Sequence, residues 1–389
     1  MRFLLLLTTA ALLLTACHKH DDEEPIPART VLVYMAADND LSGFAMYDIN
    51  EMMTGSKDLT KRDRLVIFVD KPNQLPYMME VNNGDTIRKK TWEKELKSSN
   101  AETLRMALQW TVENYPADSY GLVLWGHADG WTIHNEATSR PERAYGADTT
   151  NGTHFMNIPT MAKALGTLPH LLFIFADCCS FQCAESAYEL RKVTDYIIAS
   201  PAEIPGEGAP YHRVVPKLFS RSERFYEGIV DAYAIRHDVP LSVVKTSMTD
   251  SLAQATRSVL EKSITPGDYP DVDSLIYYFS HTSFDMNDFM LRHVPTEEYE
   301  AWKDVFDKTV VYKAWARLWT ARFVPYTDNN YTDFLDFKVT EERQGCVSMF
   351  VYQNPWNVDI VFRSTVSSQN QTISSMEWYE AAGLKNLGW

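Results

Sequence analysis

Short apolar runs alternate with amphipathic segments through the first half of the chain. Near-continuous apolar runs, typical of strands buried on both faces of a parallel sheet, occur at residues 30–37, 64–70, 120–125, 171–175 and 195–199. Apolar residues at helical spacing occur between them, at residues 41–52, 100–115, 158–165 and 183–190. Repeated strand, loop and helix units predict an α/β fold with a mainly parallel central sheet and helices on both faces.

The remaining segments show weaker patterns. Looser alternation at residues 77–92, with Asn83-Gly84 in its middle, predicts a small hairpin. Residues 132–156 are polar and predict a long surface loop, whereas helical spacing dominates beyond about residue 215. Strand-like runs return at residues 346–352 and 359–363. We therefore expect a core at residues 29–215 and a helical and strand extension at residues 216–389 packed on that core.

The first 28 residues have the composition of a targeting segment. Arg2 precedes an apolar run from Phe3 to Leu14, which is too short for a membrane-spanning helix of roughly 20 residues. Small residues then lead to Cys17, so the segment resembles a bacterial lipoprotein signal that is removed at residues 1–16, with the lipid on Cys17. Residues 17–28 form an acidic tether, whose acidic run resembles signals that send some lipoproteins to the cell surface. The expected location is the bacterial outer membrane, on the cell surface or the periplasmic face.

Composition and charge limit the classes of partner. The 389 residues are 45% hydrophobic, which is ordinary for a globular protein with a large core. With 37 Lys and Arg against 52 Asp and Glu, the formal charge is −15, which would repel a phosphate backbone. Nucleic acid is therefore not an expected partner. Five cysteines are too few for a disulfide scaffold, so each one needs its own explanation.

Two predicted strand ends carry groups suited to nucleophilic catalysis. His127 follows the strand at 120–125, and the adjacent Cys178 and Cys179 follow the strand at 171–175. The carboxyl ends of parallel strands gather at one edge of a sheet, where an imidazole can take the proton of a thiol. A cysteine at a helix N-terminus would gain further from the helix dipole, and nearby backbone N–H groups could bind an oxyanion. Taken singly, such residues are more often a packed thiol and a structural histidine.

Longer blocks around these residues resemble the clostripain family of cysteine peptidases. They are TVLVYMAADND with DINE (30–40 and 48–51), LVLWGHADGW (122–131), DCCSFQCAESAYEL (177–190) and ASPAEIPGEGAPY (199–211). The resemblance implies a caspase-like three-layer α/β sandwich, with His127 as general base and Cys179 as nucleophile. Cys178 stands where the family has alanine, so the adjacent thiol is the one ambiguity. The implied oxyanion site is the backbone of Ala128 and Cys179, with Ala128 in place of a family glycine.

The resemblance also implies a substrate preference and an activation step. The family cleaves after basic residues, and its pattern assigns Asp177 and Glu207 to the substrate's cationic side chain. Glu203 lies in the same loop as Glu207. The alternative roles are a helix cap for Asp177 and a solvated surface position for Glu207. Relatives cut themselves between the histidine and cysteine segments, which predicts self-processing here between Arg143 and Ala144. Calcium dependence occurs in the family, so calcium stays a candidate cofactor, although the acidic composition locates no ion site.

Together these features predict a lipid-anchored cysteine endopeptidase that cleaves peptides or proteins after Arg or Lys. A serine hydrolase or a zinc enzyme is disfavoured because the sequence has no G-x-S-x-G, HExxH or paired CxxC motif. Two alternatives stay open: a non-catalytic surface lipoprotein that binds ligands on the same fold, and a cysteine transferase or ligase in which an amine replaces water.

Overall fold

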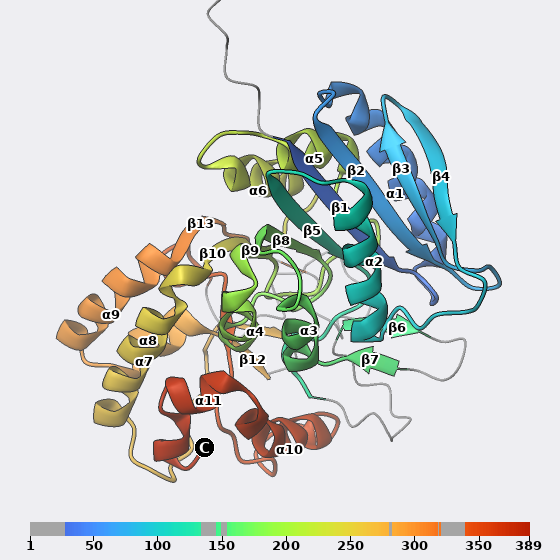
Figure 1. Ribbon diagram of the computed structural model, residues 1–389. Coiled ribbons are helices and arrows are strands. Elements are labelled where there is room, and N and C mark those ends of the chain that lie inside the picture. The colour runs from blue at the N-terminus through green and yellow to red at the C-terminus, as the bar shows by residue number, and fades with distance from the viewer. Residues whose placement is uncertain (1–27, 134–144, 149–153, 280–281, 318, 320–338) are drawn as a thin grey trace, which may run out of the picture.

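One nine-stranded sheet organises the molecule (Figure 1). The computed structural model describes residues 28–133, 145–148, 154–279, 282–317, 319 and 339–389. The strand order is β13-β10-β9-β8-β5-β1-β2-β3-β4. The strands are β1 (Arg29–Ala36), β2 (Asp63–Asp70), β3 (Tyr77–Asn82), β4 (Asp85–Thr91), β5 (Ser119–Trp125), β8 (Leu171–Asp177), β9 (Thr194–Ala199), β10 (Leu241–Lys245) and β13 (Val310–Ala314). The five central strands, from β9 to β2, are parallel, and antiparallel strands close both edges.

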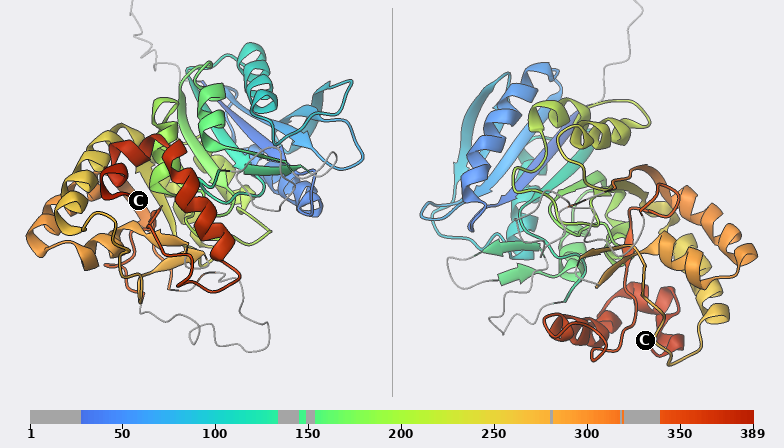
Figure 2. Two further views of the ribbon diagram at one scale, coloured as in Figure 1. Left: turned by 90° about the horizontal axis from the view of Figure 1, so that it is seen from below. Right: turned by 180° about the vertical axis from the view of Figure 1, so that it is seen from behind.

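Helices cover both faces of this sheet and make three layers (Figure 2). One face carries α1 (Ser42–Gly55), α5 (Tyr211–Leu218) and α6 (Phe225–Ala234), and the other carries α2 (Ala101–Asn114), α3 (Ile158–Leu165) and α4 (Ala184–Glu189). Alternate side chains of β1 point to opposite faces of the sheet. Val33 packs in the cluster that contains Ile49 of α1, whereas Leu32 packs in the cluster that contains Leu104 of α2. The predicted α/β architecture with a mainly parallel centre is confirmed.

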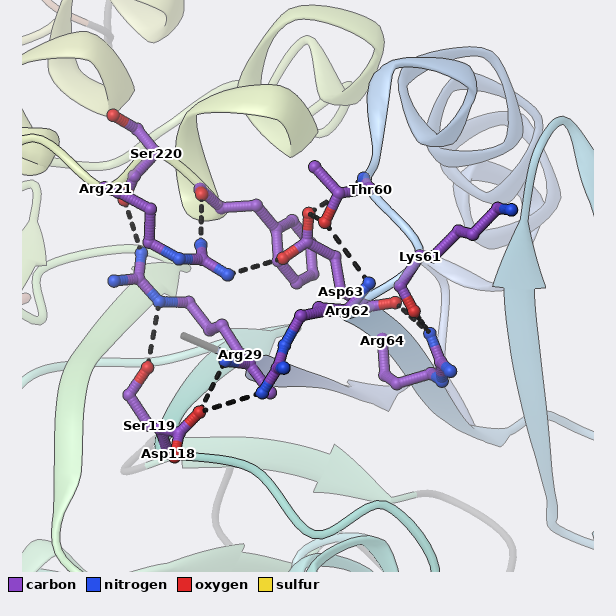
Figure 3. A network of polar contacts seen from close by, with 12 residues as sticks. Arg29, Thr60, Lys61, Arg62, Asp63, Arg64, Asp118, Ser119, Ser220 and Arg221 are labelled. Atoms are coloured by element: carbon purple, nitrogen blue, oxygen red, sulfur yellow. Dashed lines mark hydrogen bonds and ion pairs between the residues drawn. The ribbon is translucent and has the colours of Figure 1, made fainter. Parts of the chain in front are cut away.

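Polar contacts fix the amino ends of the first strands (Figure 3). The guanidinium of Arg29 at the start of β1 donates to the carbonyl oxygens of Leu218 (2.9 Å) and Ser220 (2.8 Å). Beside it, the buried carboxylate of Asp63 accepts from Arg221 at 2.6 Å. These contacts join the amino ends of β1 and β2 to the end of α5 and the segment after it. The carboxyl ends of the strands lie at the opposite edge of the sheet.

The second half of the chain contributes strands to the central sheet and a further layer of helices. β10 and β13 extend the sheet beyond β9. The other elements are α7 (Thr249–Ser263), α8 (Met286–His293), α9 (Thr296–Thr309), α10 (Arg363–Thr372) and α11 (Glu377–Ala381), with a small sheet of β11 (Tyr277–Phe279), β12 (Ser283–Asp285) and β14 (Ser348–Met349). Ser348 N donates to Gln182 O at 3.0 Å, so this half of the chain contacts the loop that follows the paired cysteines.

Several local predictions were wrong. Residues 132–156 contain a short hairpin, β6 (Tyr145–Asp148) and β7 (His154–Met156), within the expected loop. Only Ser348–Met349 of the run at 346–352 pairs as a strand, and residues 359–362 lead through a turn into α10, which begins at Arg363. β10 and β13 fall in the region expected to be helical: each is only five residues long, and its neighbours in the sheet are distant in sequence.

Among the residues that the structure describes, no helix is long and apolar enough to cross a membrane.

Candidate active site

A cavity of about 320 Å³ opens at the carboxyl ends of β5 and β8. Its lining residues are Leu41, Trp125, Gly126, His127, Asp177, Cys179, Glu203, Ile204, Pro205, Gly206 and Gly208. β5 and β8 are parallel neighbours, with Trp125 opposite Asp177 in their register, so the residues that follow the two strands share one edge. The fold therefore brings together His127, Asp177 and Cys179, three residues that the sequence singled out.

The two adjacent cysteines have different surroundings. Cys178 is buried, and burial raises the pKa of its thiol well above the usual value, with the neighbouring Cys179 adding to the effect. Cys179 is partly exposed and lines the cavity, where its Sγ accepts from Ile204 N at 3.4 Å. Ser180 has a φ of +55°, which is rare for a residue with a side chain and turns the backbone sharply after Cys179.

The helix that follows starts later than its sequence pattern suggested. α4 begins at Ala184, and Cys183 is its N-cap residue with extended backbone instead of a residue one turn inside the helix. Cys179 lies five positions before the first helical residue, so the expected help from the helix dipole is small at this distance. Cys183 is buried with its Sγ 3.0 Å from Ser186 Oγ, in agreement with a packed thiol.

His127 is held by a residue that the sequence did not single out. Its Nε2 lies 2.7 Å from Oδ1 of Asp40, in the turn between β1 and α1. Asn39 shapes this turn, because its Oδ1 accepts from Leu41 N at 2.9 Å and its Nδ2 donates to Ala36 O at 2.9 Å. The signal that could have found Asp40 is its position directly after a buried strand, at the same sheet edge as His127.

A glycine lets the chain turn before His127. Gly126 has a φ of +147°, and a Cβ at this position would lie 3.0 Å from Ala36 O. Ala128, the predicted oxyanion residue, is buried, forms an isolated bridge with Tyr145 and does not have a positive φ. Alanine therefore fits the backbone conformation at position 128 without strain.

Asp177 is buried at the edge of the cavity. Its Oδ2 accepts from Ala209 N at 3.0 Å and from Tyr211 Oη at 2.7 Å, whereas its Oδ1 has no hydrogen-bond partner among the described residues. Burial raises the pKa of this carboxyl to about 6, and the hydrogen bonds from Ala209 and Tyr211, the nearby Tyr233 hydroxyl and the charge of Arg236 oppose the rise. Gly208 has a φ of +54°, and a Cβ there would meet Oδ2 at 2.8 Å, so only glycine fits against this carboxylate. The contribution of Tyr211 and Ala209 was not predicted.

The two glutamates of the following loop are placed differently. Glu203 lines the cavity, whereas Glu207 is exposed and lies outside the set of lining residues. Two contacts anchor this loop to the rest of the fold: Tyr211 N donates to Glu51 Oε2 at 2.8 Å, and His237 Nε2 lies 2.8 Å from Gly208 O.

A second buried acid lies near Asp177. Asp48 of α1 accepts from Trp125 Nε1 at 2.7 Å, and burial raises its pKa to about 8, with the charge of Asp177 adding to the effect. At neutral pH Asp48 is therefore mostly protonated and Asp177 mostly ionised. Of these two neighbouring carboxyls, Asp177 is the one that carries the negative charge at neutral pH.

Within the described part of the chain, no group of three or more His, Cys, Asp or Glu side chains is arranged to hold a metal ion. Cys17, Arg143 and Ala144 lie outside the described residues.

A thiol and an imidazole at neighbouring strand ends of a three-layer α/β sandwich are the chemical groups of a cysteine peptidase. The chain belongs to the clostripain family of cysteine peptidases, whose sequence model (Peptidase_C11) matches residues 33–369. Clostripain of Hathewaya histolytica is 25% identical over 221 residues, which are 49% of this chain and 42% of that protein. The chain thus matches less than half of the length of this relative.

Solved structures of similar proteins cover the chain more fully. A secreted C11 cysteine protease from Bacteroides thetaiotaomicron, in complex with an irreversible peptide inhibitor, is 28% identical with a TM-score of 0.76. An inactive zymogen C11 protease from Parabacteroides distasonis is 27% identical with a TM-score of 0.71. Each match covers 92% of this chain and 99% of the other. The expected caspase-like fold is confirmed by these structures.

Proposed function

We propose that the protein is a cysteine endopeptidase that cleaves peptide bonds after Arg or Lys. The observation that supports this specificity most directly is Oδ1 of Asp177, a buried carboxylate oxygen without a hydrogen-bond partner among the described residues. It belongs to a residue that lines the same cavity as the Cys179 thiol and the His127 imidazole. A buried carboxylate oxygen that accepts no hydrogen bond is costly, so a cationic side chain that enters the cavity and donates to Oδ1 would be bound favourably.

In the proposed mechanism, Cys179 and His127 act as a catalytic dyad. The His127 imidazole takes the thiol proton, and the thiolate of Cys179 attacks the carbonyl carbon of the residue at P1 (the residue before the cleaved bond). Backbone N–H groups of Ala128 and Cys179 would stabilise the resulting oxyanion. The C–N bond then breaks as the imidazolium returns its proton to the leaving amine, and water hydrolyses the thioester with His127 again acting as base.

Asp177 is the proposed partner of the P1 side chain, together with a glutamate of the loop after β9. Glu207 is the residue that the family pattern indicates, and Glu203 is the one that lines the cavity. A guanidinium can bind two carboxylates at once, and an ammonium can bind them as a point charge, so both Arg and Lys fit.

Turnover of defined peptides tests this proposal. Fluorogenic peptides with Arg, Lys, citrulline, Asp or Asn at P1 are incubated with the protein, with and without an amine acceptor, and with the Cys179→Ala and Cys178→Ala variants. We expect cleavage only after Arg and Lys, lost in Cys179→Ala and kept in Cys178→Ala. No turnover of any peptide would favour a binding module, and transfer to the amine in preference to water would favour a ligase.

We also propose self-processing between Arg143 and Ala144 and a lipid on Cys17. Intact-mass measurement of the wild type should show a cut after Arg143 that is missing in Cys179→Ala. If both proteins stay uncut or are cut alike, self-processing is excluded. The expected location is the outer membrane, and labelling with radioactive palmitate, lost in Cys17→Ser, tests the lipid.

A further inference from the structure

We infer that Asp40 is a positioning residue, which orients the His127 imidazole and stabilises its protonated form during acyl transfer. This inference rests on the proposed function. It assigns a role in the reaction, exerted through His127, to a residue outside the set that lines the cavity.

The contact between Asp40 and His127 is short and involves one particular nitrogen of the imidazole ring. Asp40 Oδ1 lies 2.7 Å from Nε2 of His127, within the range of a charge-assisted hydrogen bond. A carboxylate only accepts, so Nε2 carries the hydrogen and donates to it. Nδ1 is then the ring nitrogen that takes the proton of Cys179, and the positive charge that develops on the ring faces a fixed negative charge.

The turn that carries Asp40 is built to hold this position. Asn39, directly before it, is buried and bonds to the backbone on both sides of the turn, at Ala36 and Leu41. It also donates to Ala147 O at 2.7 Å, which ties the turn to the hairpin that follows the His127 segment. Ser42 N donates to Asn39 O at 3.1 Å and completes the turn at the start of α1. The backbone of Asp40 is therefore fixed even though its side chain is 77% exposed.

The other ionisable groups of the described cavity differ in their effect on His127. Asp177 at the end of β8, Cys179 just after it and Glu203 in the loop after β9 line the same cavity. Asp177 Oδ2 accepts hydrogen bonds from Ala209 N and Tyr211 Oη. Cys179 is the proton donor in the proposed reaction. Asp40 has a carboxylate oxygen within hydrogen-bond distance of the His127 ring.

The chain offers a matched control. His170 and Asp195 form a second His–Asp pair, in which the histidine is more exposed than His127, with Nε2 of the histidine 2.9 Å from Oδ1 of the aspartate. Neither residue lines the cavity. Asp195→Asn therefore makes the same chemical change at a similar pair with no expected effect on Cys179.

The test measures the reactivity of Cys179 without any peptide substrate. The full chain is treated with iodoacetamide between pH 5 and 9, and the rate of modification at Cys179 is followed by peptide mass spectrometry in the wild type, Asp40→Asn, Asp40→Ala and Asp195→Asn. If Asp40 stabilises the imidazolium that pairs with the thiolate, its loss raises the pH midpoint of alkylation by about half to one pH unit, the size expected for one partly solvated charge pair. Removal of a negative charge that acts only through space would instead favour the thiolate and lower the midpoint. An unchanged or lowered midpoint in both Asp40 variants, or an equal rise in Asp195→Asn, overturns the inference.

Turnover provides a second readout. With an Arg peptide, we expect kcat to fall about three- to tenfold in both Asp40→Asn and Asp40→Ala, with KM changed less than about twofold. A structural role alone would change thermal stability without this split between kcat and KM. If the wild type cleaves no peptide, the proposed function fails while the alkylation midpoints still test the role of Asp40. If it cleaves and both Asp40 variants match it, only the positioning role fails.

Discussion

The sharpest test of the proposed specificity is the pH dependence of substrate binding. Asp177 has a pKa of about 6 because it is buried, so its charge is present above pH 6 and is lost as the pH falls through this value. A peptide with Arg at P1 keeps its own charge over this range. Acidification and Asp177→Asn should therefore weaken binding for the same reason, the loss of one carboxylate charge.

The size of the effect follows from the ionised fraction. With a pKa of about 6, roughly ten-elevenths of the carboxyl is ionised at pH 7 and roughly one-eleventh at pH 5. The Kd of an Arg peptide should thus rise about tenfold between these values. Truncation of one partner of a buried charge pair costs about 2–5 kcal/mol, so Asp177→Asn should weaken binding at pH 7 by at least about thirtyfold. Asparagine keeps an acceptor for Ala209 N and Tyr211 Oη, which limits the change in the fold.

Binding is measured by calorimetry in the Cys179→Ala background, so that the peptide is not consumed. A peptide with citrulline at P1 has nearly the same shape without the charge and is the matched control, with a Kd that should not change between pH 7 and pH 5. The reasoning is refuted if Arg and citrulline peptides bind equally at pH 7. It is also refuted if the pH dependence for the Arg peptide persists in Asp177→Asn.

Two further predictions concern stability. Burial raises the pKa of Asp70 to about 8, so its ionisation destabilises the fold increasingly as the pH rises from about 4 to 8, by up to about 1.4 kcal/mol per pH unit. Asp70→Asn should therefore lose less stability than the wild type between pH 5 and pH 8 in urea unfolding, and an equal loss in both proteins would contradict this. Gly121 lies in the middle of β5, where a Cβ would come within 2.3 Å of the Phe173 ring, so Gly121→Ala should cost about 1–3 kcal/mol in the same assay. An unchanged urea midpoint would show that the ring can move aside, and Phe173→Leu in the same chain should recover part of any loss.

The residues that line the cavity were predicted in part. His127, Cys179 and Asp177 could be located because each follows an apolar run, and the carboxyl ends of parallel strands meet at one edge. Asp40 follows such a run too, but nothing local distinguishes it from Asp38, which is buried in the same turn region. Which of two nearby carboxylates reaches an imidazole 87 positions away depends on the turn geometry that Asn39 sets.

The order of the first strands and helices is contained in the sequence by itself. The length and period of an apolar run are local properties of the sequence. A strand buried on both faces and a helix with one apolar side can therefore be recognised from residues that are close together along the chain. Pairing is not local in this sense. β10 and β13 were missed because their place beside β9 depends on contacts with residues far along the chain.

The choice between the two adjacent cysteines likewise depends on tertiary structure and not on the local sequence. The sequence places both Cys178 and Cys179 after a buried strand, and only the family resemblance favours the second. The tertiary structure buries Cys178 in the core and turns Cys179 toward the cavity, because the chain leaves β8 through a sharp turn with Ser180 at positive φ. Adjacent residues of identical chemistry thus differ in their access to solvent, and that access depends on a backbone turn that other parts of the fold hold in place.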